Sequence, residues 1–250
     1  MITHTTVGPL ARDVSLLDIA KTMVMSNSNY VLLEGAPIKL VDSVQVLRAI
    51  STANSVVDLA DLLSSEAEQW SYEVPIVNDE REARKELVVR DLNAVVLKGG
   101  NVASSIYLLG KFMKSLPDLQ AKDVLDSRVL LADPMMSIKE AIVRSLTFNL
   151  NGYLFVGQKR IMGYVTPLRF LEHFTREEVL SMINAGDPRT LEEAVGDIVS
   201  SSEVYYFYEA KVKELATQML NSQMEVLPIV DKSKKMVGVV KAKVLLGYTL

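Results

Sequence analysis

Four similar segments recur along this 250-residue chain, and the repetition limits the fold more strongly than any single motif. Each segment has two strand-like apolar runs on either side of a turn, followed at once by a helix-like run. The segments are residues 30–50, 94–112, 153–174 and 226–248. We take one position in each segment as equivalent: Lys39, Asn101, Gly163 and Gly238. These positions are spaced by 62, 62 and 75 residues. A period of about sixty residues is typical of a repeated α/β unit.

Each segment is predicted to be a β-hairpin that follows one helix and precedes another. Glycine-containing turns reverse the first three hairpins, as Gly99-Gly100 does in the second copy, and Asp231-Lys232-Ser233 reverses the fourth. Upstream of the first hairpin, Asp13 or Ser15 can accept the free amide hydrogens of a helix whose apolar residues recur at helical spacing. The corresponding stretch of the second copy, residues 78–89, is more polar and less regular. The order helix, strand, strand, helix is therefore predicted for every copy.

The spacing also predicts how the chain is divided. Short acidic and apolar stretches at 56–63, 121–131 and 195–207 are predicted to be connecting segments that enter an edge strand. Residues 175–195 lengthen the last interval and are predicted to be a helical connector. We expect two pairs of repeats, 1–118 and 119–250, in which the single repeats span about 1–52, 53–118, 119–177 and 194–250.

Composition excludes several classes of protein. Apolar residues make up 49% of the chain, which is enough for a sizeable core, and the net charge of −4 gives no reason to expect nucleic-acid binding. There is no cysteine and there are only two histidines, so disulfides, zinc-thiolate sites and histidine-rich metal sites are not expected. No export signal or apolar stretch of about 18 residues is present, so we expect a cytoplasmic protein without membrane contact.

The third and fourth repeats resemble the CBS domain, named for cystathionine β-synthase. The resemblance rests on DVLDSRVLLADPMMSIKEAIVRSL with GYLFVGQKRIMGYVTPLRFL, and on DIVSSSEVYYFYEAKVKELATQML with VLPIVDKSKKMVGVVKAKVLL. It covers nearly the whole chain once the first two repeats are included. The resemblance implies an α/β fold of tandem units, paired sheet to sheet with pseudo-twofold symmetry. It also implies a sensor module whose clefts hold adenosine-containing ligands.

In that family, a Gly-hydrophobic-hydrophobic-Thr/Ser-x-x-Asp stretch commonly contacts ribose and phosphate where the last strand turns into the last helix. A hydroxyl and helix-start amides suit phosphate oxygens, and a carboxylate suits a ribose diol. No repeat of this chain keeps the carboxylate: Arg169, Val244 and Tyr107 stand at that position in the third, fourth and second repeats. The candidate ligand contacts are Gly163, Tyr164, Val165, Thr166, Arg169, Ser104, Asp42 and Lys241.

Two of these candidates also have a purely structural interpretation. Thr166 and Arg169 suit a phosphate, but Thr166 equally suits a helix cap and Arg169 a solvated surface position. Lys241 can attract an anion together with Lys243, or both lysines can simply be solvated.

We therefore expect a regulatory protein that binds AMP, ADP, ATP or S-adenosylmethionine in a cleft between repeats. It would require no cofactor and would respond to the energy state of the cell by changing its association with a protein partner or with itself. The alternative is a scaffold for oligomerisation whose clefts are closed, which Tyr107 and Val244 favour. An enzyme is the third class, and we do not expect one because no catalytic constellation is found.

Overall fold

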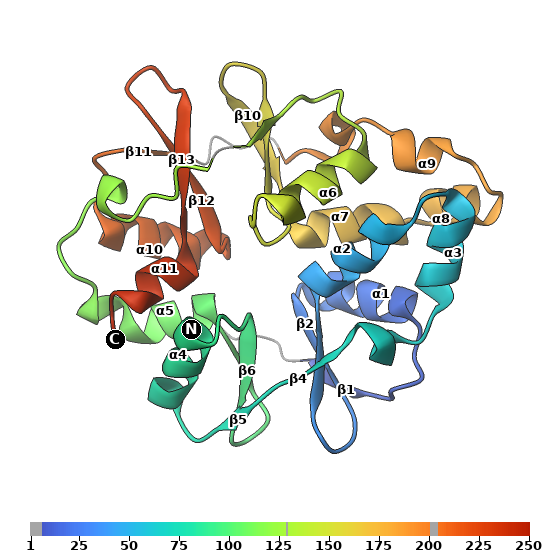
Figure 1. Ribbon diagram of the computed structural model, residues 1–250, viewed down its shortest axis with the longest axis horizontal. Helices are drawn as coiled ribbons and strands as arrows, with labels where there is room; N and C mark the ends of the chain where they lie inside the picture. Colours follow the sequence, from blue (N-terminus) through green and yellow to red (C-terminus); the bar gives the residue numbers. More distant parts are fainter. Residues whose placement is uncertain (1–6, 129, 201–204) are drawn as a thin grey trace.

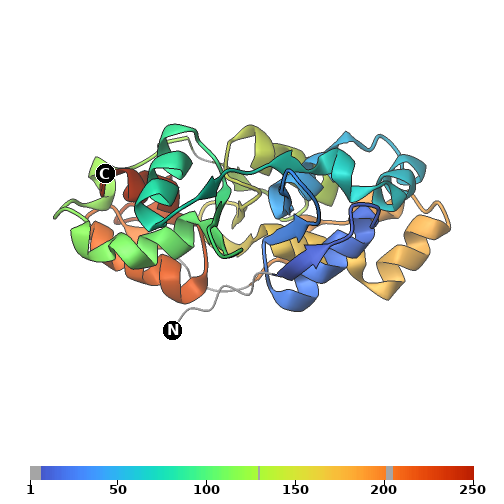
Figure 2. The ribbon, with the colours of Figure 1, turned by 90° about the horizontal axis from the view of Figure 1, so that it is seen from below.

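Four small sheets and their helices surround a common centre in the computed structural model, which describes residues 7–128, 130–200 and 205–250 (Figure 1). The body is flattened, as the view turned by 90° shows (Figure 2). Two sequence predictions fall partly outside the described residues: the absence of an export signal at 1–6, and the part of the last connecting segment at 201–204.

The four sheets share one topology. Each has an antiparallel hairpin and a further strand, from the preceding segment, parallel to the first hairpin strand. In the first sheet β4 (Tyr72–Glu73) is added beside β3. The other strands, in sheet groups, are β1 (Val7–Leu10), β2 (Tyr30–Leu33) and β3 (Lys39–Asp42); β5 (Ile76–Val77), β6 (Ala94–Leu97) and β7 (Val102–Ser104); β8 (Leu131–Ala132), β9 (Leu154–Gly157) and β10 (Ile161–Val165); β11 (Tyr206–Phe207), β12 (Val226–Val230) and β13 (Met236–Lys241).

One helix precedes each hairpin and one follows it, as predicted. Ser15 rather than Asp13 caps the first of them, since its hydroxyl accepts from the amide of Asp18. The polar second copy forms a complete unit like the others. The helix pairs are α1 (Leu16–Ser26) and α2 (Ser43–Thr52); α4 (Glu80–Val89) and α5 (Ser105–Phe112); α6 (Ile138–Thr147) and α7 (Pro167–Thr175); α10 (Val212–Ser222) and α11 (Ala242–Gly247).

One predicted connecting segment is wrong, because residues 56–63 lie in a helix, α3 (Val56–Ser64). Ser55 and Asp58 form a capping box there: each side chain accepts from the other residue's backbone amide. This reciprocal pairing satisfies two amides and starts the helix. In the region predicted as a helical connector, α8 (Glu177–Asn184) and α9 (Arg189–Glu192) form.

Each repeat packs against one neighbour through its sheet and against another through its helices. The sheets of the first two repeats bury a shared apolar cluster of Leu32, Leu40, Val74, Ala94, Val96 and Val102. Helices α1 and α2 pack on α6 and α7, and α3 packs on α8. Helices α4 and α5 pack in the same way on α10 and α11. The four repeats therefore close around the centre, where helix ends and the open ends of the hairpins, opposite their turns, meet (Figure 1).

Candidate functional site

Four of the predicted ligand contacts occupy equivalent positions, at the N-cap of the helix after each hairpin. They are Asp42, Ser104, Thr166 and Lys241, and their spacing of 62, 62 and 75 residues repeats the period predicted from the sequence. Three of them cap their own helix. The side chains of Asp42, Ser104 and Thr166 accept from the amide three residues on at 2.8, 3.4 and 3.2 Å. Lysine has no acceptor, so Lys241 cannot do this.

In the third repeat, the residues that were predicted to contact a ligand are in contact with other protein atoms. A Cβ added to Gly163 would lie 2.4 Å from Val199 and 2.5 Å from the carbonyl oxygen of Ser200. Tyr164 pairs with Ser200 through the backbone, and the side chain of Val165 is buried. The guanidinium of Arg169 donates to the carbonyl of Ile198 at 3.1 Å and to the carboxylate of Glu172 at 2.5 Å.

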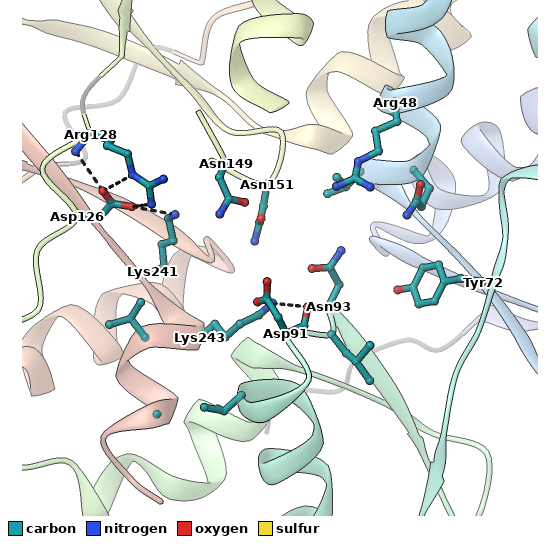
Figure 3. A pocket seen from close by; sticks show the side chains of 16 residues that line it. Arg48, Tyr72, Asp91, Asn93, Asp126, Arg128, Asn149, Asn151, Lys241 and Lys243 are labelled. Atoms are coloured by element: carbon teal, nitrogen blue, oxygen red, sulfur yellow. Dashed lines mark hydrogen bonds and ion pairs between the residues drawn. The ribbon is translucent and has the colours of Figure 1, made fainter. Parts of the chain in front are cut away.

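A cavity of about 580 Å³ lies at the centre of the molecule, and all four repeats contribute side chains to it (Figure 3). Lys241 is the predicted contact that lines it, and Lys243 joins it two residues later. Both lysines belong to the fourth repeat. We call this space the central cavity.

One side of the central cavity holds a group of three charges. The carboxylate of Asp126 accepts from Arg128 at 2.8 and 3.0 Å and lies 3.1 Å from the ammonium of Lys241. The bonds from Arg128, and then Lys241, hold the pKa of Asp126 well below its usual range. Asp126 therefore stays ionised and fixes the two cations at this wall.

The opposite side carries a cation without such a partner. The guanidinium of Arg48, on α2, makes no hydrogen bond or ion pair within the described part of the chain. Between the two sides, Lys243 pairs with Asp91 at 2.8 Å. Figure 3 shows Arg48 facing the Asp126 group across the open space. Four cations and two carboxylates thus line the central cavity, which favours an anionic ligand.

Asp42, another predicted contact, lies beneath the cavity wall and is 1% exposed. Its carboxylate accepts from the hydroxyl of Tyr72 at 2.9 Å and from the amide of Asn93 at 3.0 Å, besides capping α2. Burial, and then the charge of Asp42, raises the pKa of Tyr72 well above its usual value. Tyr72 and Asn93 themselves line the central cavity, so Asp42 positions two of its walls.

The sequence did not reveal most of the cavity residues. Arg48, Arg128 and Asp126 match no position of the family stretch, because they come from a helix interior and a connecting segment. Asp91 and Asn149 each follow the end of a helix, and their own backbone φ is positive, at 54° and 55°. Asn and Asp tolerate this conformation, so their residue type was a local signal in the sequence. Within residues 7–128, 130–200 and 205–250, no group of three or more metal-binding side chains is found. No helix there has the length and apolarity to cross a bilayer.

Residues 195–249 match the CBS domain family, which confirms the predicted class for the fourth repeat. The whole chain has the fold of tandem CBS repeats. Protein MJ1225 from Methanocaldococcus jannaschii, proposed to be an archaeal homolog of g-AMPK, superimposes with a TM-score of 0.85 over 99% of this chain and 98% of its own, at 14% identity. A conserved protein from Pyrococcus horikoshii gives a TM-score of 0.59 over 99% and 97%, also at 14% identity. No curated protein matches the chain by sequence.

Proposed function

We propose that this protein is a regulatory sensor that binds an adenine nucleotide, or a related adenosyl or phosphate compound, in the central cavity. The observation that carries the proposal is the excess of cations around this cavity, including Arg48, whose guanidinium makes no hydrogen bond or ion pair among the residues that the structure describes. Phosphate oxygens would bind Arg48 and the wall formed by Lys241 and Arg128, since guanidinium groups suit phosphate. Sequence and site both support an anion; the nucleoside part of the proposal rests on the family.

Binding would act on all four repeats together. Because the cavity residues come from every repeat, a ligand that favours one arrangement of the pairs shifts the population towards it. This shift would change how the protein associates with a protein partner or with itself. We propose that the protein acts in the cytoplasm, where the concentrations of adenine nucleotides report the energy state of the cell.

Isothermal titration calorimetry with AMP, ADP, ATP and S-adenosylmethionine tests the proposal. We expect at least one of them to bind, and we expect Arg48→Gln to weaken the binding about tenfold, the loss of one charge-assisted contact. Arg81→Gln is the matched control, because Arg81 is an exposed arginine on α4 away from the central cavity. Binding that both variants leave unchanged would place the ligand elsewhere. No binding by any of the four compounds would contradict the proposal.

A ligand-free scaffold is the second candidate, and one observation favours it for two repeats. In the third repeat Arg169 bonds to protein atoms, and in the second Tyr107 donates to the carboxylate of Glu80 at 3.1 Å. If the scaffold is the whole function, none of the four compounds will bind, and analytical ultracentrifugation will show an assembly that ATP does not change.

A further inference from the structure

Four polar residues that lead into the first hairpin strands meet below the central cavity, and one of them differs in charge. Asn29, Asn93 and Glu225 stand directly before the first hairpin strand of their repeats, and Asn151 stands three residues before that strand in the third repeat. All four line a void of about 10 Å³. Val44, Asn93 and Asn151 line both this void and the central cavity, so the two spaces share a wall. Glu225 is the one carboxylate among these four residues.

Glu225 is bonded to residues of other repeats. The hydroxyl of Tyr30, in the first repeat, lies 3.3 Å from the Glu225 carboxylate and 3.3 Å from the backbone carbonyl of Asn93, in the second. The backbone amide of Glu225 donates to the hydroxyl of Tyr153, in the third repeat, at 3.2 Å. Glu225 therefore contacts the first and third repeats directly, and Tyr30 extends the network to the second.

The geometry around Tyr30 can accommodate a proton on Glu225 without the loss of a hydrogen bond. A tyrosine hydroxyl has one hydrogen, so it cannot donate fully to both acceptors at 3.3 Å. When Glu225 is ionised, either its carboxylate or the carbonyl of Asn93 lacks that donor. When Glu225 is protonated, it donates to the oxygen of Tyr30, and Tyr30 donates to Asn93. Both bonds then form at once.

The charges that face Glu225 link it to the central cavity. Burial raises the pKa of Glu225 to about 7, and Asp42 adds to this effect. Lys243, on α11, and the hydroxyl of Tyr30 oppose it. Tyr30 faces Asp42, Tyr72 and Tyr153 as well as Glu225, and burial keeps its own pKa well above the usual value. Lys243 thus acts on Glu225 and also lines the central cavity, where its ammonium pairs with Asp91 at 2.8 Å.

We propose that Glu225 takes up a proton when an anion binds in the central cavity, so that the anion binds more tightly as the pH falls. An anion beside Lys243 competes with Glu225 for the same positive charge and adds a negative charge next to the shared wall. Both effects favour neutral Glu225. By reciprocity, protonation of Glu225 strengthens anion binding by the same factor. This inference rests on the proposed function of the central cavity.

Calorimetric titration with ATP at pH 6, 7 and 8 tests the linkage in wild type, Glu225→Gln and Glu178→Gln. Glu178 is an exposed carboxylate on α8, so its variant makes the same charge change far from the void. ATP titrates identically in all three experiments, and the comparison therefore isolates the protein. We expect Kd to rise from pH 6 to pH 8 by roughly fivefold more in wild type and Glu178→Gln than in Glu225→Gln, the lower end of typical couplings.

A second measurement covers the case in which Glu225→Gln does not fold. At about pH 7.5 ATP is mostly ionised, because its last phosphate pKa is about 6, so a cationic site can only remove its remaining protons. Calorimetry of wild type in two buffers of different ionisation enthalpy should therefore show net proton uptake. Net release, or equal pH dependence in wild type and Glu225→Gln, overturns the linkage while leaving ATP binding intact. If ATP binds at no pH, the proposed function and this inference both fail.

Discussion

The third and fourth repeats share one topology but use the start of their last helix differently. In the third, Thr166 caps α7 and Arg169 bonds to Ile198 and Glu172, so both side chains serve the fold. In the fourth, Lys241 cannot cap α11, and its ammonium lies in the central cavity beside Asp126. The difference teaches that this position can stabilise a helix start or serve a cavity. A helix cap and a charge that lines a cavity are alternative uses of it.

The tightest contact of the third repeat gives the largest expected effect. Gly163→Ala should lower the free energy of unfolding by about 2–3 kcal/mol, because the new methyl group meets Val199 and the backbone of Ser200. Urea unfolding followed by circular dichroism measures this. Gly247→Ala, in the fourth repeat, is the control: its nearest neighbour would be Val88 at 3.6 Å, an ordinary contact. Equal losses in both variants would contradict the close packing of Gly163 against Val199 and Ser200.

Glu225 can ionise, whereas Asn29, Asn93 and Asn151 beside the same void cannot, and the pH dependence of stability tests this difference. Its folded pKa of about 7 lies above the ordinary value of 4.5, so the folded chain holds the proton longer and stability falls as the pH rises from about 4.5 to 7. Glu225→Gln removes this loss and should exceed wild type in unfolding free energy by about 1–2 kcal/mol more at pH 8 than at pH 4.5. Urea unfolding at both pH values checks this; a gain independent of pH would contradict it.

Lys241→Gln should affect the ligand more than the fold. We expect ATP to bind about tenfold more weakly, equal to about 1.4 kcal/mol, because a cation of the cavity is lost. Calorimetry measures the affinity, and the thermal midpoint reports the fold. Unchanged affinity would mean that the wall of Asp126 and Arg128 does not touch the ligand.

Thr166→Ala should affect the fold more than the ligand, and its effect should be smaller than that of Lys241→Gln. Loss of its cap should cost about 1 kcal/mol of unfolding free energy while ATP affinity stays the same. Thr166→Ser keeps a hydroxyl and should retain most of the stability. Weaker ATP binding in the alanine variant, at unchanged stability, would restore the third repeat as a ligand site.

Sequence reasoning reached the repeated units because they are local. Hairpin turns and apolar periodicity lie within about twenty residues of each other, and the predicted spacing recurs in the helix caps. It missed α3, whose capping box of Ser55 and Asp58 was present in the sequence. It named Lys241 and Lys243, which line the cavity, as groups that can attract an anion. It missed Arg48 and Arg128, because a site where four repeats meet depends on their packing rather than on any local pattern. The division into pairs at residue 118, and ligand contacts at Thr166 and Arg169, stay predictions.

The helix packing between the two halves of the chain has a consequence for assembly. Buried residues such as Leu109 on α5, and Phe170 and Phe174 on α7, lie on helices that pack against helices of the other half. A single chain segment near Leu116 joins the halves. Two copies could therefore exchange halves and form a domain-swapped dimer with every native contact preserved. Such a dimer would need no interface beyond the one that already closes a single chain.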